Sequence, residues 1–363
     1  MGLQRSHHVL LGLFFGLMSQ FPISVDACRL LPAPPELENT FWVHVEGPCL
    51  PGEQETFAVK GEDLLHAVEK GMSVDLEGVL VVDDVMLDLL PLRDAAGNSD
   101  IPGAVRAHLQ QRGVAAVRII PGSLSIRHSR FEKVLATNLV EGFLLMLERV
   151  DFTGSVFQQS VDLSKTVFVG PINFSKVRVD FEGFFIGAHF EQAVDFSQMR
   201  FGTHTRFHKA GFRDGVTFAD SRFTGVAEFL EVEFQRKADF SRAHFASGTG
   251  FSGSVFAGPA DFSTVTFDQE IYFRFTEFKQ TVSFVDAQFH NVVDFSNARF
   301  DGEKNFSGVK FKSPPTLTGS NLSLEDVLDQ GWRRPQSQFG IFAGLIILMV
   351  FYYWASRRKK PGN

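Results

Sequence analysis

The amino-acid sequence predicts an all-β protein whose central part is a solenoid, preceded by an irregular α/β cap and followed by one transmembrane helix. Phenylalanine supplies 41 of the 363 residues, whereas tyrosine and tryptophan supply three each, and the phenylalanines recur at alternating steps of five and six residues. A charge-free run at 339–355 predicts the helix. With 44% hydrophobic residues the chain can bury a sizeable core, and its net charge of −7 is too mild to indicate a general polyanion-binding protein.

Residues 1–27 have the composition of a secretory signal peptide. They carry an early Arg5, an apolar run from 9 to 17, and small or apolar residues at Val25 and Ala27 before a cleavage point. The mature chain then begins at Cys28. Lipidation of Cys28 is the alternative, although Asp26 fits the lipoprotein pattern poorly.

Cys28 and Cys49 are the two cysteines of the chain. Both follow the predicted signal peptide, so the sequence allows one disulfide that closes a short loop in an oxidising compartment. Two cysteines without a matching set of histidines are too few for a zinc site. We therefore predict no metal and no cofactor.

The sequence predicts an irregular N-terminal cap for residues 28–149. Helices are expected at 61–71 and at 99–113, with Pro102 in the first turn of the second and Gly113 just beyond its end. Strands are expected at 74–82, 114–120, 124–126 and 143–147. Such a lead-in covers the first open edge of a solenoid, which otherwise invites aggregation.

The solenoid is predicted for residues 150–322. Counting from Phe152 in alternating steps of five and six residues gives 32 positions, of which 28 are phenylalanine and the others are Leu163, Val179, Leu317 and Leu322. The residue two before each ring is mostly small or β-branched, Asp or Asn often precedes the ring, and Ser often follows it. The register does not slip between the two ends.

Neither a helix nor a plain strand explains this spacing. A helix needs apolar residues three and four apart, and a plain strand needs strict alternation over a longer run. A unit of five or six residues can instead make a short strand and a turn, and four such faces return the chain to its start one strand spacing higher. A coil then takes 22 residues, about eight coils follow one another, and the rings stack along the axis as a core.

The segments AVDFSQM, KADFSRA, PADFSTV and VVDFSNA resemble the unit of the pentapeptide-repeat family, which reads roughly Ala-(Asp/Asn)-(Leu/Phe)-(Ser/Thr)-X. The resemblance covers residues 150 to about 322 and implies a right-handed quadrilateral β-solenoid. This chain departs from the strict five-residue period by one extra residue in every second unit. Because some members of the family protect gyrase by imitating DNA, the resemblance also raises that function.

The C-terminal part predicts a cap, a membrane span and a tail. Residues 323–334 are expected to form a short capping helix and linker, with Ser323 and Asp326 as a capping-box-like start. The run 339–355 can cross a bilayer, and the tail 356–363 carries four cations that favour a cytoplasmic location. A buried terminal helix is the alternative. We therefore predict a single-pass cell-membrane protein whose solenoid lies on the extracytoplasmic side, either periplasmic or extracellular.

The 22-residue coil predicts a column of residues on one outer face. The residues just before the second ring of alternate repeats form it: Arg178, Arg200, Arg222, His244, Thr266, Gln288 and Lys310. A companion column, offset by 11 residues, contains Val167, His189, Gly211, Glu233, Val255, Glu277 and Arg299. The cations of the first column are a hypothetical binding site for an anionic envelope component or an acidic protein, because the guanidinium fork suits phosphate and carboxylate. Pairing of these cations with acids on the adjoining face is the alternative.

Other polar clusters give weaker signals. Asp83, Asp84 and Asp88 lack the spacing of a calcium loop, and His204 and His208 lack an evident third metal ligand. The sequence contains no phosphate loop, nucleophile elbow or Rossmann fingerprint. These observations predict a protein without catalytic activity.

Three functions fit the sequence. The preferred one is a membrane-tethered, exported scaffold or binding module, with the lipid bilayer as a partner through the C-terminal helix and no nucleic acid. The second is a gyrase-protecting DNA mimic, but residues 151–322 carry 20 acids and 17 bases, a net charge of −3 that is too neutral to imitate a duplex. The third is an exported β-helical polysaccharide-active enzyme, although the carboxylates here belong to the repeat itself.

Overall fold

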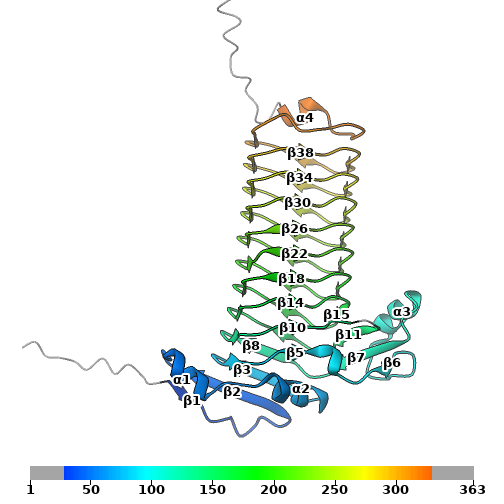
Figure 1. Cartoon of the computed structure of the whole chain (residues 1–363). Helices are drawn as coiled ribbons and strands as arrows, with labels where there is room; N and C mark the ends of the chain where they lie inside the picture. Colours follow the sequence, from blue (N-terminus) through cyan, green and yellow to red (C-terminus); the bar gives the residue numbers. More distant parts are fainter. Residues whose placement is uncertain (1–27, 140, 329–363) are drawn as a thin grey trace, which may run out of the picture.

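The computed structural model describes residues 28–139 and 141–328, which form a rod of stacked coils (Figure 1). The predicted signal peptide 1–27, the predicted span 339–355 and the basic tail 356–363 lie outside the described residues. Within the described ranges, every helix is too short or too polar to cross a bilayer.

Four sheets make the sides of the rod, and we number these faces one to four in the order in which the chain visits them. Face one contains β1 (Arg29–Leu30), β2 (Thr40–Glu46), β3 (Ser73–Glu77), β8 (Leu124–Arg127), β12 (Val150–Asp151), β16 (Ile172–Asn173), β20 (Val194–Asp195), β24 (Val216–Thr217), β28 (Ala238–Asp239), β32 (Ala260–Asp261), β36 (Val282–Ser283) and β40 (Lys304–Asn305). Face two contains β4 (Leu80–Val81), β9 (Arg130–Phe131), β13 (Val156–Phe157), β17 (Arg178–Val179), β21 (Arg200–Phe201), β25 (Arg222–Phe223), β29 (His244–Phe245), β33 (Thr266–Phe267), β37 (Gln288–Phe289) and β41 (Lys310–Phe311).

Face three contains β5 (Val85–Met86), β10 (Leu135–Ala136), β14 (Val161–Asp162), β18 (Glu182–Phe184), β22 (His204–Arg206), β26 (Val226–Glu228), β30 (Thr249–Gly250), β34 (Ile271–Tyr272) and β38 (Val293–Asp294). Face four contains β6 (Arg93–Asp94), β7 (Ala116–Ile120), β11 (Phe143–Met146), β15 (Thr166–Phe168), β19 (His189–Phe190), β23 (Gly211–Phe212), β27 (Glu233–Phe234), β31 (Val255–Phe256), β35 (Glu277–Phe278) and β39 (Arg299–Phe300). The helices are α1 (Pro51–Thr56), α2 (Gly61–Glu69), α3 (Gly103–Gln111), α4 (Leu324–Leu328) and the 3-10 helix η1 (Leu87–Leu89).

The pairing register confirms the predicted coil of 22 residues. Val150 pairs with Ile172, and Ile172 pairs with Val194, all in parallel strands. Arg213 and Glu191, which are 22 residues apart, contact each other across neighbouring coils. Four sheets around one core confirm the β-solenoid, and its handedness stays a prediction.

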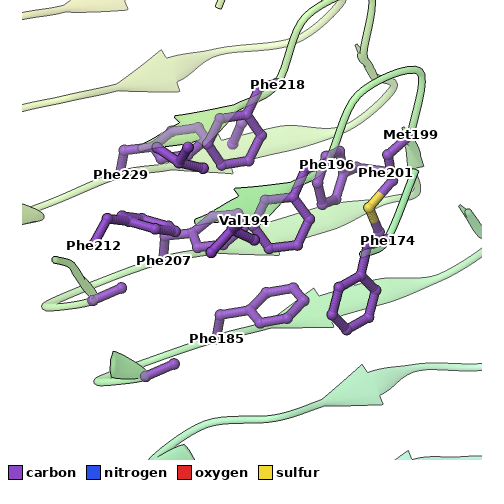
Figure 2. Packing of buried hydrophobic residues seen from close by; sticks show 14 of the residues in the cluster. Phe174, Phe185, Val194, Phe196, Met199, Phe201, Phe207, Phe212, Phe218 and Phe229 are labelled. Carbon is purple, nitrogen blue, oxygen red and sulfur yellow. The ribbon is translucent and has the colours of Figure 1, made fainter. Parts of the chain in front are cut away.

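The rings form the main core, as Figure 2 shows for the coils around Phe207. Along the axis Phe218 stacks on Phe196 with centroids 5.0 Å apart and on Phe240 with centroids 4.8 Å apart. Across the axis Phe218 meets Phe207 nearly edge to face, at 5.5 Å and 84°. Both arrangements suit the ring quadrupole, and phenylalanine fills the space without a polar atom that would need a partner.

The alternation of five and six residues reflects two kinds of corner. In the five-residue steps one corner residue adopts a positive φ, such as Gln198 at 56° and Lys209 at 57°. These left-handed residues turn the chain sharply between faces one and two and between faces three and four. The six-residue steps, such as 179–185, turn without such a residue and use the additional residue instead.

The stack begins before residue 150, so the predicted boundary between cap and solenoid lies too late. Val74 pairs with Leu124, and Leu124 pairs with Val150 in the same sheet. The sequence separation between equivalent positions of neighbouring coils is 50 residues at Ser73 and 26 at Ser129. It is 22 residues in the later coils. Met146 occupies the position that Phe168 takes one coil later, so the early coils lack the ring signal. Each face therefore holds 9 to 12 strands, more than the predicted eight coils.

The helices and strands predicted for the N-terminal region are present with two differences, and the structure adds elements that were not predicted: α1, β1, β2, β5, η1, β6, β9 and β10. Helix α2 lies in the predicted range 61–71, but α3 begins at Gly103 rather than at 99. Pro102 disfavours a helical backbone at the residue before it, which excludes the earlier start. The strand predicted at 74–82 is divided into β3 and β4 by a turn at Gly78, whose φ is 67°.

Both ends of the rod are covered. At the N-terminal end α1, α2, β1 and β2 lie beneath the first coils (Figure 1), and Cys28 is joined to Cys49 by a disulfide. At the other end Ser323 and Asp326 form the predicted capping box, since each accepts a hydrogen bond from the backbone N–H of the other. Helix α4 then covers the last coil with the buried Val327. The Lys304 ammonium extends outward to Asp326, 3.5 Å away.

Candidate functional site

The predicted column lies on face two in the predicted register. Arg178 pairs with Arg200, and Arg200 pairs with Arg222, in adjacent strands. The same column continues through His244, Thr266, Gln288 and Lys310. The three arginines are exposed, because each precedes an inward ring position and alternate side chains of a strand point to opposite sides.

The cations of this column differ in their partners. The Arg178 guanidinium donates to Asp180, with Nε 2.9 Å from the carboxylate oxygen. The positions equivalent to Asp180 beside Arg200 and Arg222 are Gly202 and Thr224, which cannot form an ion pair. Arg200 and Arg222 accordingly make no ion pair or side-chain hydrogen bond to another described residue. Pairing with an acid therefore explains Arg178, whereas the neighbouring guanidiniums of Arg200 and Arg222 have no such partner among the described residues.

The part of the column nearer the C-terminal end of the rod contributes less unpaired positive charge. The His244 ring lies 2.7 Å from Asp268, whose other oxygen lies 3.0 Å from His290. Lys310 is exposed at the far end of the rod. Arg200 and Arg222 consequently form the centre of the candidate anion-binding surface.

The companion column on face four is partly covered. Val167 is fully buried and His189 is 8% exposed, because α3 packs against this face. Beyond them Gly211, Glu233 and Val255 follow in register. The sequence spacing does not indicate that α3 packs on this face, although the apolar Val167 at an outward position is a signal that something covers it.

The other polar candidates pair with nearby acids. His204 Nε2 lies 3.1 Å from Glu228, and His208 Nε2 lies 3.5 Å from Glu231. Across residues 28–139 and 141–328, no group of three or more His, Cys, Asp or Glu side chains is placed to hold a metal ion.

These faces define the class of the protein: a four-sided parallel β-solenoid with a phenylalanine core and outer faces of different charge. The family described as pentapeptide repeats, in nine copies, matches residues 185–233. Residues 185–233 therefore carry pentapeptide repeats, and the same 22-residue pairing register continues on both sides of the matched residues. No curated protein and no solved structure matches the chain.

Proposed function

We propose that this protein is an exported, membrane-tethered binding rod without catalytic activity, and that face two binds a phosphate-bearing surface. The observation that carries the proposal is the pair of neighbouring, exposed and unpaired guanidiniums of Arg200 and Arg222. Unpaired arginines in stacked strands repel each other modestly and bring no structural benefit, whereas their planar forks suit phosphate oxygens. Lipid headgroups and phosphate-rich envelope polymers share this chemistry.

The repeat's carboxylates support a binding role over a catalytic one. Asp195 accepts a hydrogen bond from the backbone N–H of Ser197 at 2.7 Å, and Asp261 does the same for Ser263 at 2.9 Å. These carboxylates hold turns, so they are not arranged as an acid and base pair. A basic column also argues against imitation of DNA, which requires a surface of negative charge.

Export and tethering rest on sequence patterns outside the described residues. Residues 1–27 resemble a signal peptide, and 339–355 with its basic tail resembles a membrane span. The Cys28–Cys49 disulfide fits an oxidising compartment.

Replacing Arg200 and Arg222 with glutamate is expected to weaken binding to anionic vesicles about 30-fold or more. Each cation near an anionic surface contributes about 1 kcal/mol, and the variant removes two cations and adds two acids. Vesicle co-sedimentation at low and high salt measures the change, with an isolated envelope fraction as a second arm that distinguishes lipid from polymer phosphate.

The matched control is Lys279→Glu with Arg299→Glu, which makes the same charge change elsewhere. Both residues are exposed and lie outside face two, with Arg299 on face four. Equal loss of binding in the two double variants would reject face two as the binding surface and would leave net charge as the cause.

The topology predicts a clear protease pattern. In intact cells with an outer barrier the rod is expected to be protected from added protease, and after removal of that barrier it is expected to be digested while the basic tail survives. An epitope placed after residue 363 reports on the tail. Digestion of the rod from the cytoplasmic side would contradict the orientation.

A further inference from the structure

The rod carries a groove on face four, on the opposite side from the arginine column of face two. It arises because the chain inserts β6 and α3 between β5 of face three and β7 of face four. The apolar side of α3, with Val105 and Leu109, packs on Leu145 and Val167 in a second small core. This fixes α3 against the outer surface of the first coils, as Figure 1 shows near β7 and β11.

The C-terminal end of α3 forms one wall of the groove. Its His108 meets His189 of β19 edge to face, with ring centroids 4.8 Å apart. Beyond this contact lies an open groove of about 950 Å³, lined by Arg112, Gly211, Arg213, Glu233 and Arg236 in addition to the two histidines. Gly211 makes the floor, since a Cβ there would lie 2.7 Å from Nδ1 of His189.

His189 is buried and His108 is half-buried, and within the described part of the chain the Nε2 atom of each ring lacks the hydrogen bond that buried polar atoms require. His189 is 8% exposed, and the Nε2 atoms of both rings are buried with no partner among the described residues. Nδ1 of His189 faces the space above Gly211. Burial lowers the pKa of His189 to about 3, with Arg112 and His108 contributing, and burial also lowers the pKa of His108. Both rings are therefore neutral, and each offers one N–H and one lone pair.

The rim of the groove combines free cations with a carboxylate. Arg213 is bound to Glu191 at 2.8 Å, whereas Arg112 and Arg236 are exposed and make no ion pair with another described residue. Glu233 accepts a hydrogen bond only from Gln235, at 3.3 Å, among the described residues. Phe212 is buried, so the lining presents no exposed phenyl, tyrosine or tryptophan ring for stacking a nucleobase.

We propose that this groove binds a small anion rich in hydroxyl groups, the chemical class of sugar acids and sugar phosphates. The free guanidiniums of Arg112 and Arg236 recognise the carboxylate or phosphate, and Glu233 accepts hydrogen bonds from hydroxyl groups. Nδ1 of His189 binds a further hydroxyl above Gly211. This site is independent of the proposed function, because it lies on the opposite face and uses other residues.

The test measures binding of glucuronate and of glucose 6-phosphate by calorimetry, with glucose and inorganic phosphate as comparisons. We expect at least one of the two anionic sugars to bind more tightly than both comparison compounds and to shift the ring resonances of His108 and His189. The carboxylate and phosphate arms distinguish the two sources of the anion. Absence of binding by both anionic sugars up to about 10 mM would overturn the proposal.

Variants connect the binding to the groove. Arg112→Ala and Glu233→Gln are each expected to weaken binding at least ten-fold, and Gly211→Ala is expected to abolish it by filling the floor. Arg112 and Glu233 are exposed, so their variants keep the fold. Arg299→Ala, further along face four and outside the groove lining, is the control and is expected to bind normally. Unchanged affinity in Arg112→Ala and Glu233→Gln, or inorganic phosphate binding as tightly as glucose 6-phosphate, would refute the site.

Discussion

Replacing Phe273 with alanine is expected to destabilise the solenoid by about 3 to 5 kcal/mol. Phe273 is fully buried and stacks between Phe251 and Phe295, with centroids 5.3 Å and 5.1 Å away. It also meets Phe262 and Phe284 edge to face. The substitution removes contacts to the coil above, the coil below and the neighbouring faces at once. Because the backbone of each coil is fixed by the coils on both sides, the cavity cannot collapse easily.

Phe275, two residues further along, is the matched control. It is 63% exposed at a corner, so Phe275→Ala removes the same atoms without opening a cavity, and a change within about 0.5 kcal/mol is expected. Urea denaturation followed by circular dichroism compares the two variants with the unchanged chain. Similar losses in both variants would mean that the ring ladder is not what holds the coils together.

The stretch from Phe152 to Phe311 could be predicted because one residue type repeats in one register. Local geometry determines this part: a ring inward, a small residue two before it, and a corner residue such as Gln198 in the left-handed region. Since each coil contacts only its neighbours, the period alone predicts which side chains become neighbours in space. The pairing of Arg200 with Arg222 followed directly from that period.

The first coils could not be predicted in the same way. Ile126 and Met146 occupy inward positions without a ring, and steps of 50 and 26 residues interrupt the period. Hydrophobic residues of many kinds can fill a core position, so a pattern that depends on phenylalanine fails where Leu, Ile and Met replace it. The early coils therefore looked like an irregular cap.

The two candidate sites also differ in how far the sequence predicts them. The arginine column depends on the period, whereas the groove depends on tertiary packing of α3 against face four. Nothing in the spacing of His108 and His189 indicates that they meet, because they lie on elements 81 residues apart in a chain whose regular contacts span 22. The single sequence signal was the apolar Val167 at an outward position, followed by the similarly placed Val169.

Inserting five residues after Phe240 is expected to lower the melting temperature by roughly 10 °C or more. The backbone N–H of Phe240 donates to Asp261 in the next coil at 2.7 Å, and Asp239 accepts from the backbone N–H of Ser241 at 2.9 Å. The insertion either moves every later residue on by one face, which separates Phe240 from Phe262, or it breaks this turn to form a loop. Both outcomes remove ring stacking or ladder hydrogen bonds from the middle of the rod.

Two control variants distinguish the loss of the 22-residue register from the effect of simply adding residues to the chain. Duplicating residues 219–240 at the same point adds a full coil of 22 residues, so every ring meets an equivalent ring and the melting temperature is expected to change little. Five Gly and Ser residues inserted after Gly253 enter an exposed corner between faces three and four, where the chain already carries extra residues between β10 and β11. A long surface loop costs little, so this variant is expected to stay close to the unchanged chain. If thermal denaturation gives one melting temperature for all three variants, the 22-residue register does not determine the stability of the rod.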